Sequence, residues 1–218
     1  MASPRRISRL GVNCFLVEEG DGLTLVDTML PRNARRILAA ADRPVVRIAL
    51  THAHGDHVGS LDELAGQLPH AEVSISTRDA RLLGGDMSLD PGEPEDKLRG
   101  NYPGADRRPD RTFEPGERVG SLEVVAAPGH TPGQVAFLDT RDLTLYCADA
   151  YSTLGGVATS AKLNPRFPLP ALSTWHRPTA LATAKALRAL DPARLAPGHG
   201  KVVESPGAAM DAAIAKAS

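Results

Sequence analysis

The chain has 218 residues, of which 42% are apolar and 23% are charged. These proportions are typical of a globular protein that buries its core as one domain, here residues 1–218. The formal net charge of −1 and the lack of a long apolar stretch exclude a strong positive field for nucleic acid and a membrane span, so neither partner is expected.

The start of the chain carries paired arginines, Arg5 and Arg6. Such a pair is found in twin-arginine export signals, which also need an apolar stretch of about 7–15 residues. The apolar run 12–17 is shorter and ends in two glutamates, so export is not expected. Two cysteines, Cys14 and Cys147, lie inside apolar runs and are expected to be buried free thiols. A reducing cytoplasm is therefore the expected location.

The first half of the chain predicts strands, followed by alternating strands and helices. Apolar runs bounded by turn residues predict strands over 12–17, 23–26, 45–50 and 73–75. Helical spacing predicts helices over 33–41, after Pro31, and over 61–68, with Ser60 as the N-cap.

The second half begins with residues 84–118, which are rich in Gly, Pro and charge and predict a long surface excursion with a short helix near 95–99. A second irregular excursion is predicted over 155–170. Strands are predicted over 122–126, 134–138, 143–147 and 194–196, and helices from about 173 or 178 to 190 and over 208–216. Both halves place strands before a strand–loop–helix unit, which predicts two sheets packed face to face with helices outside.

A six-residue motif, His52-Ala53-His54-Gly55-Asp56-His57, directly follows the predicted strand 45–50. Imidazole and carboxylate are the ligands of Zn and related metals. In extended chain His52 and His54 point the same way and can hold one ion. Asp56 and His57 follow where the chain turns into a helix and can face a second ion. This density of ligands predicts a metal site.

Three further candidate ligands follow later predicted strands. His130 lies in a tight loop after 122–126, Asp149 follows 143–147, and His199 stands between two glycines after 194–196. Polar groups on loops at one edge of a sheet scaffold are the usual construction of an active site.

The motif, followed by His130, Asp149 and His199 in this order, resembles the metallo-β-lactamase superfamily over about residues 12–201. The resemblance implies an α/β fold, a four-layer αβ/βα sandwich with a two-metal site between the sheets. It further implies that His52, His54 and His130 hold the first metal. By the same resemblance Asp56, His57 and His199 hold the second metal, and Asp149 bridges both.

Two divalent ions, two carboxylates and one bridging hydroxide leave the site with a charge of about +1, and such a pair ionises water at neutral pH. We therefore expect a dinuclear metal-dependent hydrolase. The metal-bridging hydroxide, oriented by Asp56 as the catalytic residue, attacks the carbonyl of a small thioester, ester or lactone. Zn is the default metal, with Fe or Mn as alternatives.

The resemblance favours the glyoxalase II and lactonase branch, because it implies that true β-lactamases carry another residue type where Asp149 stands. Residues 200–218 are too few for the helical region with which glyoxalase II recognises glutathione. The expected partner is a small-molecule substrate; its identity and the oligomeric state are left open. His176 and Tyr151 are weaker candidates for substrate contact, and Trp175 is expected to be a packing anchor.

Three alternative functions stay open at this point. One is a mononuclear iron persulfide dioxygenase, which would leave Asp56, His57 and His199 without a metal to bind. Another is a phosphodiesterase or nuclease of the same superfamily. The third is a metal-dependent binder without catalysis.

Overall fold

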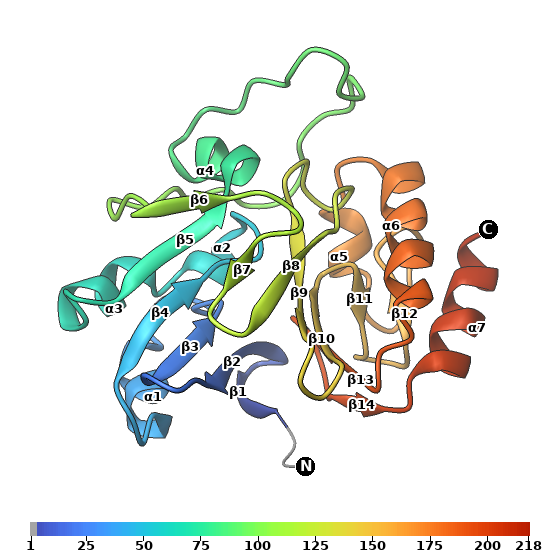
Figure 1. Cartoon of the computed structure of the whole chain (residues 1–218). Helices are drawn as coiled ribbons and strands as arrows, with labels where there is room; N and C mark the ends of the chain where they lie inside the picture. The colour runs from blue at the N-terminus through green and yellow to red at the C-terminus, as the bar shows by residue number, and fades with distance from the viewer. Residues whose placement is uncertain (1–3) are drawn as a thin grey trace.

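Two six-stranded sheets face each other in the computed structural model, which describes residues 4–218. Helices lie outside the first sheet at its lower left and outside the second sheet at the right of the molecule (Figure 1). The helices on these outer faces are α1 (Ala34–Ala40), α3 (Leu61–Gln67), α6 (Arg177–Ala189) and α7 (Gly207–Ala217). The four-layer αβ/βα sandwich is thereby confirmed.

The first sheet has the order β1-β2-β3-β4-β5-β6. Its first three strands are antiparallel neighbours, whereas β3, β4, β5 and β6 run parallel to one another. The strands are β1 (Arg5–Arg9), β2 (Val12–Glu18), β3 (Leu23–Val26), β4 (Val45–Ala49), β5 (Glu72–Ser76) and β6 (Arg111–Phe113).

The second sheet has the order β14-β13-β10-β9-β8-β7, and β10 and β13 are parallel. A small two-stranded sheet, β11 (Tyr151–Ser152) with β12 (Ala158–Thr159), lies beside it. The strands of the second sheet are β7 (Arg118–Val119), β8 (Leu122–Ala126), β9 (Val135–Asp139), β10 (Thr144–Ala148), β13 (Arg194–Pro197) and β14 (Val203–Glu204).

Three hydrophobic cores separate the four layers. Strand β2 shows how the sequence divides between them: Cys14 and Leu16 pack in the core shared with α1 and α3, whereas Phe15 and Val17 pack between the sheets. The third core joins the second sheet to α6 and α7. Because both faces of such a strand are buried, its sequence is a continuous apolar run rather than an alternating one.

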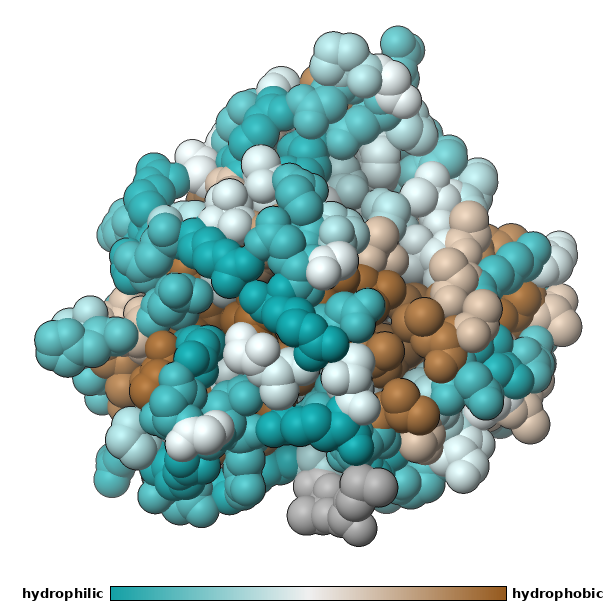
Figure 2. Space-filling model, in the orientation of Figure 1, coloured by the Kyte–Doolittle hydropathy of each residue, from teal (hydrophilic) through white to brown (hydrophobic). Residues whose placement is uncertain are grey.

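The surface agrees with this layering. Hydrophilic residues form most of the face seen in Figure 2, and apolar residues gather mainly in patches toward its middle and right. Cys14 and Cys147 are buried and free, as predicted. Within residues 4–218, no helix has the length and apolar character needed to cross a membrane.

Several predicted elements need correction. Residues 95–99 form no helix, and the excursion 84–118 contributes the edge strands β6 and β7. Strand β1 and helix α4 (Thr77–Leu83) were not predicted. Ser60 occupies the N-cap position of α3 but does not cap it, because its hydroxyl donates to the Leu30 carbonyl and accepts from the Asn33 amide.

Candidate metal centre

The predicted ligands all follow the carboxyl ends of strands. In the first sheet the motif 52–57 follows β4 and continues into the short helix α2 (Gly55–Val58). In the second sheet His130 follows β8, Asp149 follows β10 and His199 follows β13, three strands that point in one direction. The amide of Val135 donates to the carbonyl of Thr51 at 3.0 Å and joins the ligand loops of the two sheets. This topology is what brings distant parts of the chain together.

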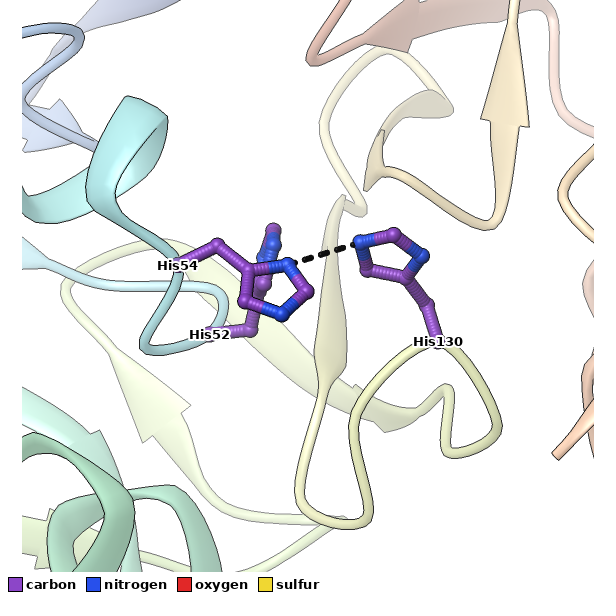
Figure 3. A group of neighbouring side chains, drawn as sticks. All are labelled: His52, His54 and His130. Carbon is purple, nitrogen blue, oxygen red and sulfur yellow. Dashed lines mark hydrogen bonds between the residues drawn. The ribbon is translucent and has the colours of Figure 1, made fainter. Parts of the chain in front are cut away.

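His52, His54 and His130 form the first group of potential ligands. Their ligand atoms lie within 4.8 Å of one another, and all three side chains are buried. His52 and His54 lie on one loop and His130 on the loop that faces it, and His54 Nδ1 lies 2.9 Å from His130 Nε2 (Figure 3).

Asp56, His57, Asp149 and His199 form the second group, also within 4.8 Å of one another. His199 Nε2 lies 3.1 Å from Asp149 Oδ2 and 3.2 Å from Asp56 Oδ2. His57 Nε2 lies 3.3 Å from Asp149 Oδ1. The other oxygen of Asp149 reaches the first group, at 3.4 Å from His130 Nε2. Asp149 is therefore placed between the two groups, and all seven predicted residues come together.

Hydrogen bonds on the outer ring nitrogens fix the tautomers of the first pair of histidines. The Thr51 hydroxyl donates to Asp27, so at 3.0 Å it accepts from His52 Nδ1 and leaves His52 Nε2 without a proton. His54 Nε2 donates to the carbonyl of Arg99 at 2.9 Å, which leaves His54 Nδ1 without a proton.

Hydrogen bonds also hold the outer ring nitrogens of His57 and His130. His57 Nδ1 donates to Asp27 Oδ2 at 2.7 Å. The Thr174 hydroxyl donates to a carbonyl, so at 3.1 Å it accepts from His130 Nδ1. In each of the four rings the outer nitrogen is thus held by a hydrogen bond and the inner nitrogen faces the centre, the arrangement that orients histidines bound to metal. His199 differs, since its Nδ1 has no hydrogen-bond partner within the described chain.

Burial and charge give the two groups opposite proton affinities. Burial lowers the pKa of His52, His54 and His130, to about 3 for His130, so these rings are neutral at pH 7. Burial also opposes the charged form of His57 and His199, but the neighbouring carboxylates outweigh it. They raise the pKa of His57 well above its usual value and that of His199 to about 9.

The two carboxylates of the centre are ionised. Burial alone would raise the pKa of both Asp56 and Asp149. The charges of His57 and His199 outweigh burial and hold both pKa values below the usual range. The second group is therefore an ion-paired cluster, in contrast to the neutral first group.

The donor set fits two divalent cations. His52 Nε2, His57 Nε2 and Asp149 Oδ1 are buried without a hydrogen-bond partner within residues 4–218. Buried polar atoms are rarely left unpaired, so each of these three atoms needs a further partner. The His52 nitrogen and the Asp149 oxygen are acceptors, and the His57 nitrogen becomes one when its ring releases a proton, so that a cation can satisfy all three.

Two buried aspartates that the sequence analysis did not select support the ligand loops. Asp27, at the end of β3, accepts from His57, from the Thr51 hydroxyl and from the Thr51 amide. Asp79, in α4, accepts from the Ala53 amide at 2.9 Å and from the Thr131 hydroxyl at 2.8 Å. It joins the loop of His54 to the loop of His130. In sequence each is a lone aspartate near a strand end, and only the tertiary structure identifies its partners.

A segment of the excursion wraps around His54. We call residues 99–103 the strap. Besides the Arg99 carbonyl on His54, the Asn101 carbonyl accepts from the Gly55 amide at 2.9 Å, and the Tyr102 ring packs on the His54 ring with centroids 4.5 Å apart. The excursion is thus part of the centre rather than a plain surface loop.

A pocket of about 320 Å³ opens onto the centre. It reaches both groups through His54, His130, Asp56, Asp149 and His199. Its size falls at the lower end of small-molecule sites, about 300–1,000 Å³. A larger cleft, about 630 Å³, lies over residues 155–166 and α7 but contains none of the clustered ligands. The smaller pocket is therefore the candidate active site.

The weaker candidates lie elsewhere. Tyr151 is fully buried and donates to the carbonyl of Ala184 at 2.7 Å, so it faces away from the pocket. His176 caps α6 and does not line the pocket. Trp175 is a packing anchor, as predicted: it is buried, and its indole NH donates to the carbonyl of Asp96 at 2.9 Å.

Comparisons with known proteins identify the family of the chain. The family model of the metallo-beta-lactamase superfamily matches residues 7–199. The uncharacterized protein YobT of Bacillus subtilis (strain 168) is 46% identical over 210 residues, which are 94% of this chain and 90% of YobT. A hydroxyacylglutathione hydrolase of Aeromonas hydrophila is 32% identical over 143 residues, 66% of this chain but 44% of that enzyme. The chain thus matches less than half the length of that enzyme.

Solved structures show the same fold. The crystal structure of TTHA1623 in a di-iron-bound form has a TM-score of 0.66 at 26% identity, over 94% of this chain and 96% of that one. The BLEG-1 B3 metallo-β-lactamase has a TM-score of 0.68 at 17% identity, over 94% of each chain. From its family model, its fold and its clustered histidines and aspartates, this chain belongs to the metallo-β-lactamase superfamily.

Proposed function

We propose that the protein is a hydrolase that uses two divalent metal ions to cleave a small thioester, ester or lactone. The observation that carries the proposal is the pair of buried ligand groups joined by Asp149 at the floor of an open pocket. In support, one relative is named a hydroxyacylglutathione hydrolase, and a structural neighbour at 26% identity is described as di-iron-bound. Zn is the default metal, with Fe or Mn as alternatives.

The residues divide into two tasks. His52, His54 and His130 would hold one ion, Asp56, His57 and His199 the other, and Asp149 would contact both. When bound, two such ions lower the pKa of water to about 7 and polarise a carbonyl oxygen.

Asp56 is the proposed catalytic residue. Its side chain is 33% exposed, against 4% for Asp149, and it lines the pocket. Because the carboxylate is ionised, it can accept a hydrogen bond from the attacking water and orient it toward a substrate carbonyl.

The same proposal covers the setting of the reaction. We propose a single domain over residues 1–218 that acts on small molecules, without a nucleic-acid or membrane partner, in the cytoplasm. The buried free thiols of Cys14 and Cys147 support a reducing compartment.

A hydrolysis screen tests the function. The Zn-, Mn- and Fe-loaded protein is assayed against S-lactoylglutathione, acyl-homoserine lactones, neutral acyl thioesters, nitrocefin and bis-nitrophenyl phosphate. We expect turnover of an ester, thioester or lactone that Asp56→Ala and His54→Ala abolish. His70→Ala, which changes an exposed histidine outside the pocket, is the matched control and should keep full activity. Turnover confined to the phosphodiester, or one iron per chain with oxygen uptake on glutathione persulfide, would contradict the proposal.

A further inference from the structure

The pocket over the metal centre has an uncharged, apolar mouth. Among residues 4–218 its lining contains no Lys or Arg, and its only charged or titratable groups belong to the ligand groups themselves. From this we propose, on the basis of the proposed function above, that the substrate is a neutral acyl compound with an apolar body. The inference excludes carriers with net negative charge, such as the glutathione tripeptide or a phosphorylated thiol.

Two apolar walls flank the centre. Leu30 and Pro31, in the connection from β3 to α1, form one wall. Leu169 and Pro170, in the short helix α5 (Leu169–Leu172), form the other. The Leu169 side chain is 59% exposed, so a bound apolar group would bury surface that now faces water.

Phe167 precedes α5 in the chain, and its ring packs beside one of the ligands. Its centroid lies 5.2 Å from that of the His199 ring. The side of the centre that carries α5 is therefore mainly apolar.

Two neutral polar side chains remain for recognition. Asn101, in the strap, and Ser173, after α5, both line the pocket. Asn101 is exposed and Ser173 is half-buried, so both are accessible to a ligand in the pocket. An amide and a hydroxyl can pair with an uncharged carbonyl or amide of the substrate, which is how a few polar groups orient a ligand in a largely apolar site.

Outside the ligand groups, the described lining of this mouth contains no cationic side chain that could pair with an anionic carrier. Moving a carboxylate or phosphate onto the walls of Leu30 and Leu169 would remove its water without a Lys or Arg to pair with it. The lining of the mouth therefore selects against negative charge on the part of the substrate that contacts it.

Two substrates with one acyl group test the inference. Butanoyl-N-acetylcysteamine is neutral, whereas butanoylglutathione carries net negative charge. With the Zn-loaded full chain we expect kcat/KM for the neutral thioester to be higher by at least about tenfold, the scale of discrimination by pocket contacts. Equal values, or a preference for the glutathione thioester, would overturn the inference and leave the hydrolase function standing. If the protein cleaved neither thioester and no ester or lactone of the screen, both the inference and the proposed hydrolase function would be overturned.

Binding without turnover gives a second readout. The thioethers S-butyl-N-acetylcysteamine and S-butylglutathione cannot be hydrolysed, and calorimetry measures their affinities directly. The neutral thioether should bind the more tightly, and the reverse order would contradict an apolar, uncharged mouth.

A pair of leucines on one helix provides matched variants. Leu169→Arg places a cation in the pocket wall and should shift the kcat/KM ratio several-fold toward butanoylglutathione. Leu172→Arg, on the same helix, 52% exposed and outside the lining, should leave the ratio unchanged. If both variants shift the ratio equally, general surface charge and not the pocket wall sets the preference, and the inference fails.

Discussion

The carboxylate of Asp27 supports two of the proposed ligands at once. It accepts directly from His57 Nδ1, and through the Thr51 hydroxyl it fixes the ring of His52. Its backbone has a φ of +60°, a conformation that costs a non-glycine residue free energy. The surrounding hydrogen bonds offset that cost, which is typical of residues that hold a functional site.

Replacing Asp27 should weaken binding of the second metal ion. In Asp27→Asn the amide can still accept from His57 but no longer stabilises its charge or accepts equally well from Thr51. We expect affinity for the second metal to fall by about 10–100-fold with the fold retained, as for other partners of metal-binding histidines. Calorimetric Zn titration measures it. Asp21→Asn, in an exposed ion pair with Arg47, is the control; an equal loss there would refute a specific role for Asp27.

The two ligand groups should differ in how metal binding depends on pH. A histidine must be neutral to bind a metal. His130, with a pKa of about 3, is already neutral at pH 7, whereas His199, with a pKa raised to about 9, must release a proton. Affinity for the second ion should therefore rise with pH up to about 9, while affinity for the first stays level between pH 6 and 8.

Calorimetry in buffers of different ionisation enthalpy counts the protons released on binding. We expect release in the second binding step and almost none in the first. Equal release in both steps would contradict the opposite pKa shifts of the two groups.

The segment 95–103, which ends in the strap, is the part of the chain that sequence patterns described least well. Residues 95–99 have helix-forming side chains, but no helix forms there. Instead the Asp96 carbonyl accepts from the Trp175 indole and the Arg99 carbonyl from His54, contacts with residues far away in sequence. Such contacts override local propensity and cannot be predicted from local pattern.

Gly100 allows the strap to approach His54. Its φ is +94°, and a Cβ there would lie 2.4 Å from His54 Nε2. We expect Gly100→Ala to displace the strap and to lower the unfolding free energy by about 2–4 kcal/mol through backbone strain and overpacking. The displacement should also lower affinity for the first metal. Denaturant unfolding and Zn titration measure the two effects.

Gly92 provides the control within the same excursion. Its φ is +90°, but a Cβ there would have no neighbour within 4 Å. Gly92→Ala therefore carries the backbone strain alone, about 1–2 kcal/mol, and should leave metal affinity unchanged. If the two variants lose affinity equally, contact of the strap with His54 is not what matters.

Long apolar runs and the ligand motif were predictable because their signals are local. The run 12–17 becomes β2, and the run 45–50 becomes β4 with the motif at its end. The edge strands β6 and β7 and the helix α4 are short, and pairing with neighbours rather than sequence pattern stabilises them. Asp27 and Asp79 could not be selected for a related reason, since their partners lie 24 or more positions away.

The centre joins the two sheets, so its metals should stabilise the whole fold. Without metal, buried atoms of His52, His57 and Asp149 lack hydrogen-bond partners within the described residues, and the two carboxylates of the centre are balanced only by the charged rings of His57 and His199. At 100 times the Kd, a bound ion adds about 2.7 kcal/mol, or about 5–10 °C in Tm for a chain of this size. Differential scanning calorimetry with and without EDTA measures the shift.

That experiment also tests the proposed single domain. Metal removal should move one cooperative transition as a whole, because both sheets contribute ligands. Two separate transitions, with only one of them sensitive to EDTA, would contradict a single unit.

Anomalous X-ray scattering from crystals of the Zn-loaded protein measures the number and position of the ions directly. We predict two peaks about 3.5–4 Å apart, the usual separation in two-metal sites. One peak should lie among His52, His54 and His130, and the other among Asp56, His57 and His199, with Asp149 between them. A single peak at full Zn occupancy, or peaks away from these side chains, would contradict the two-metal centre.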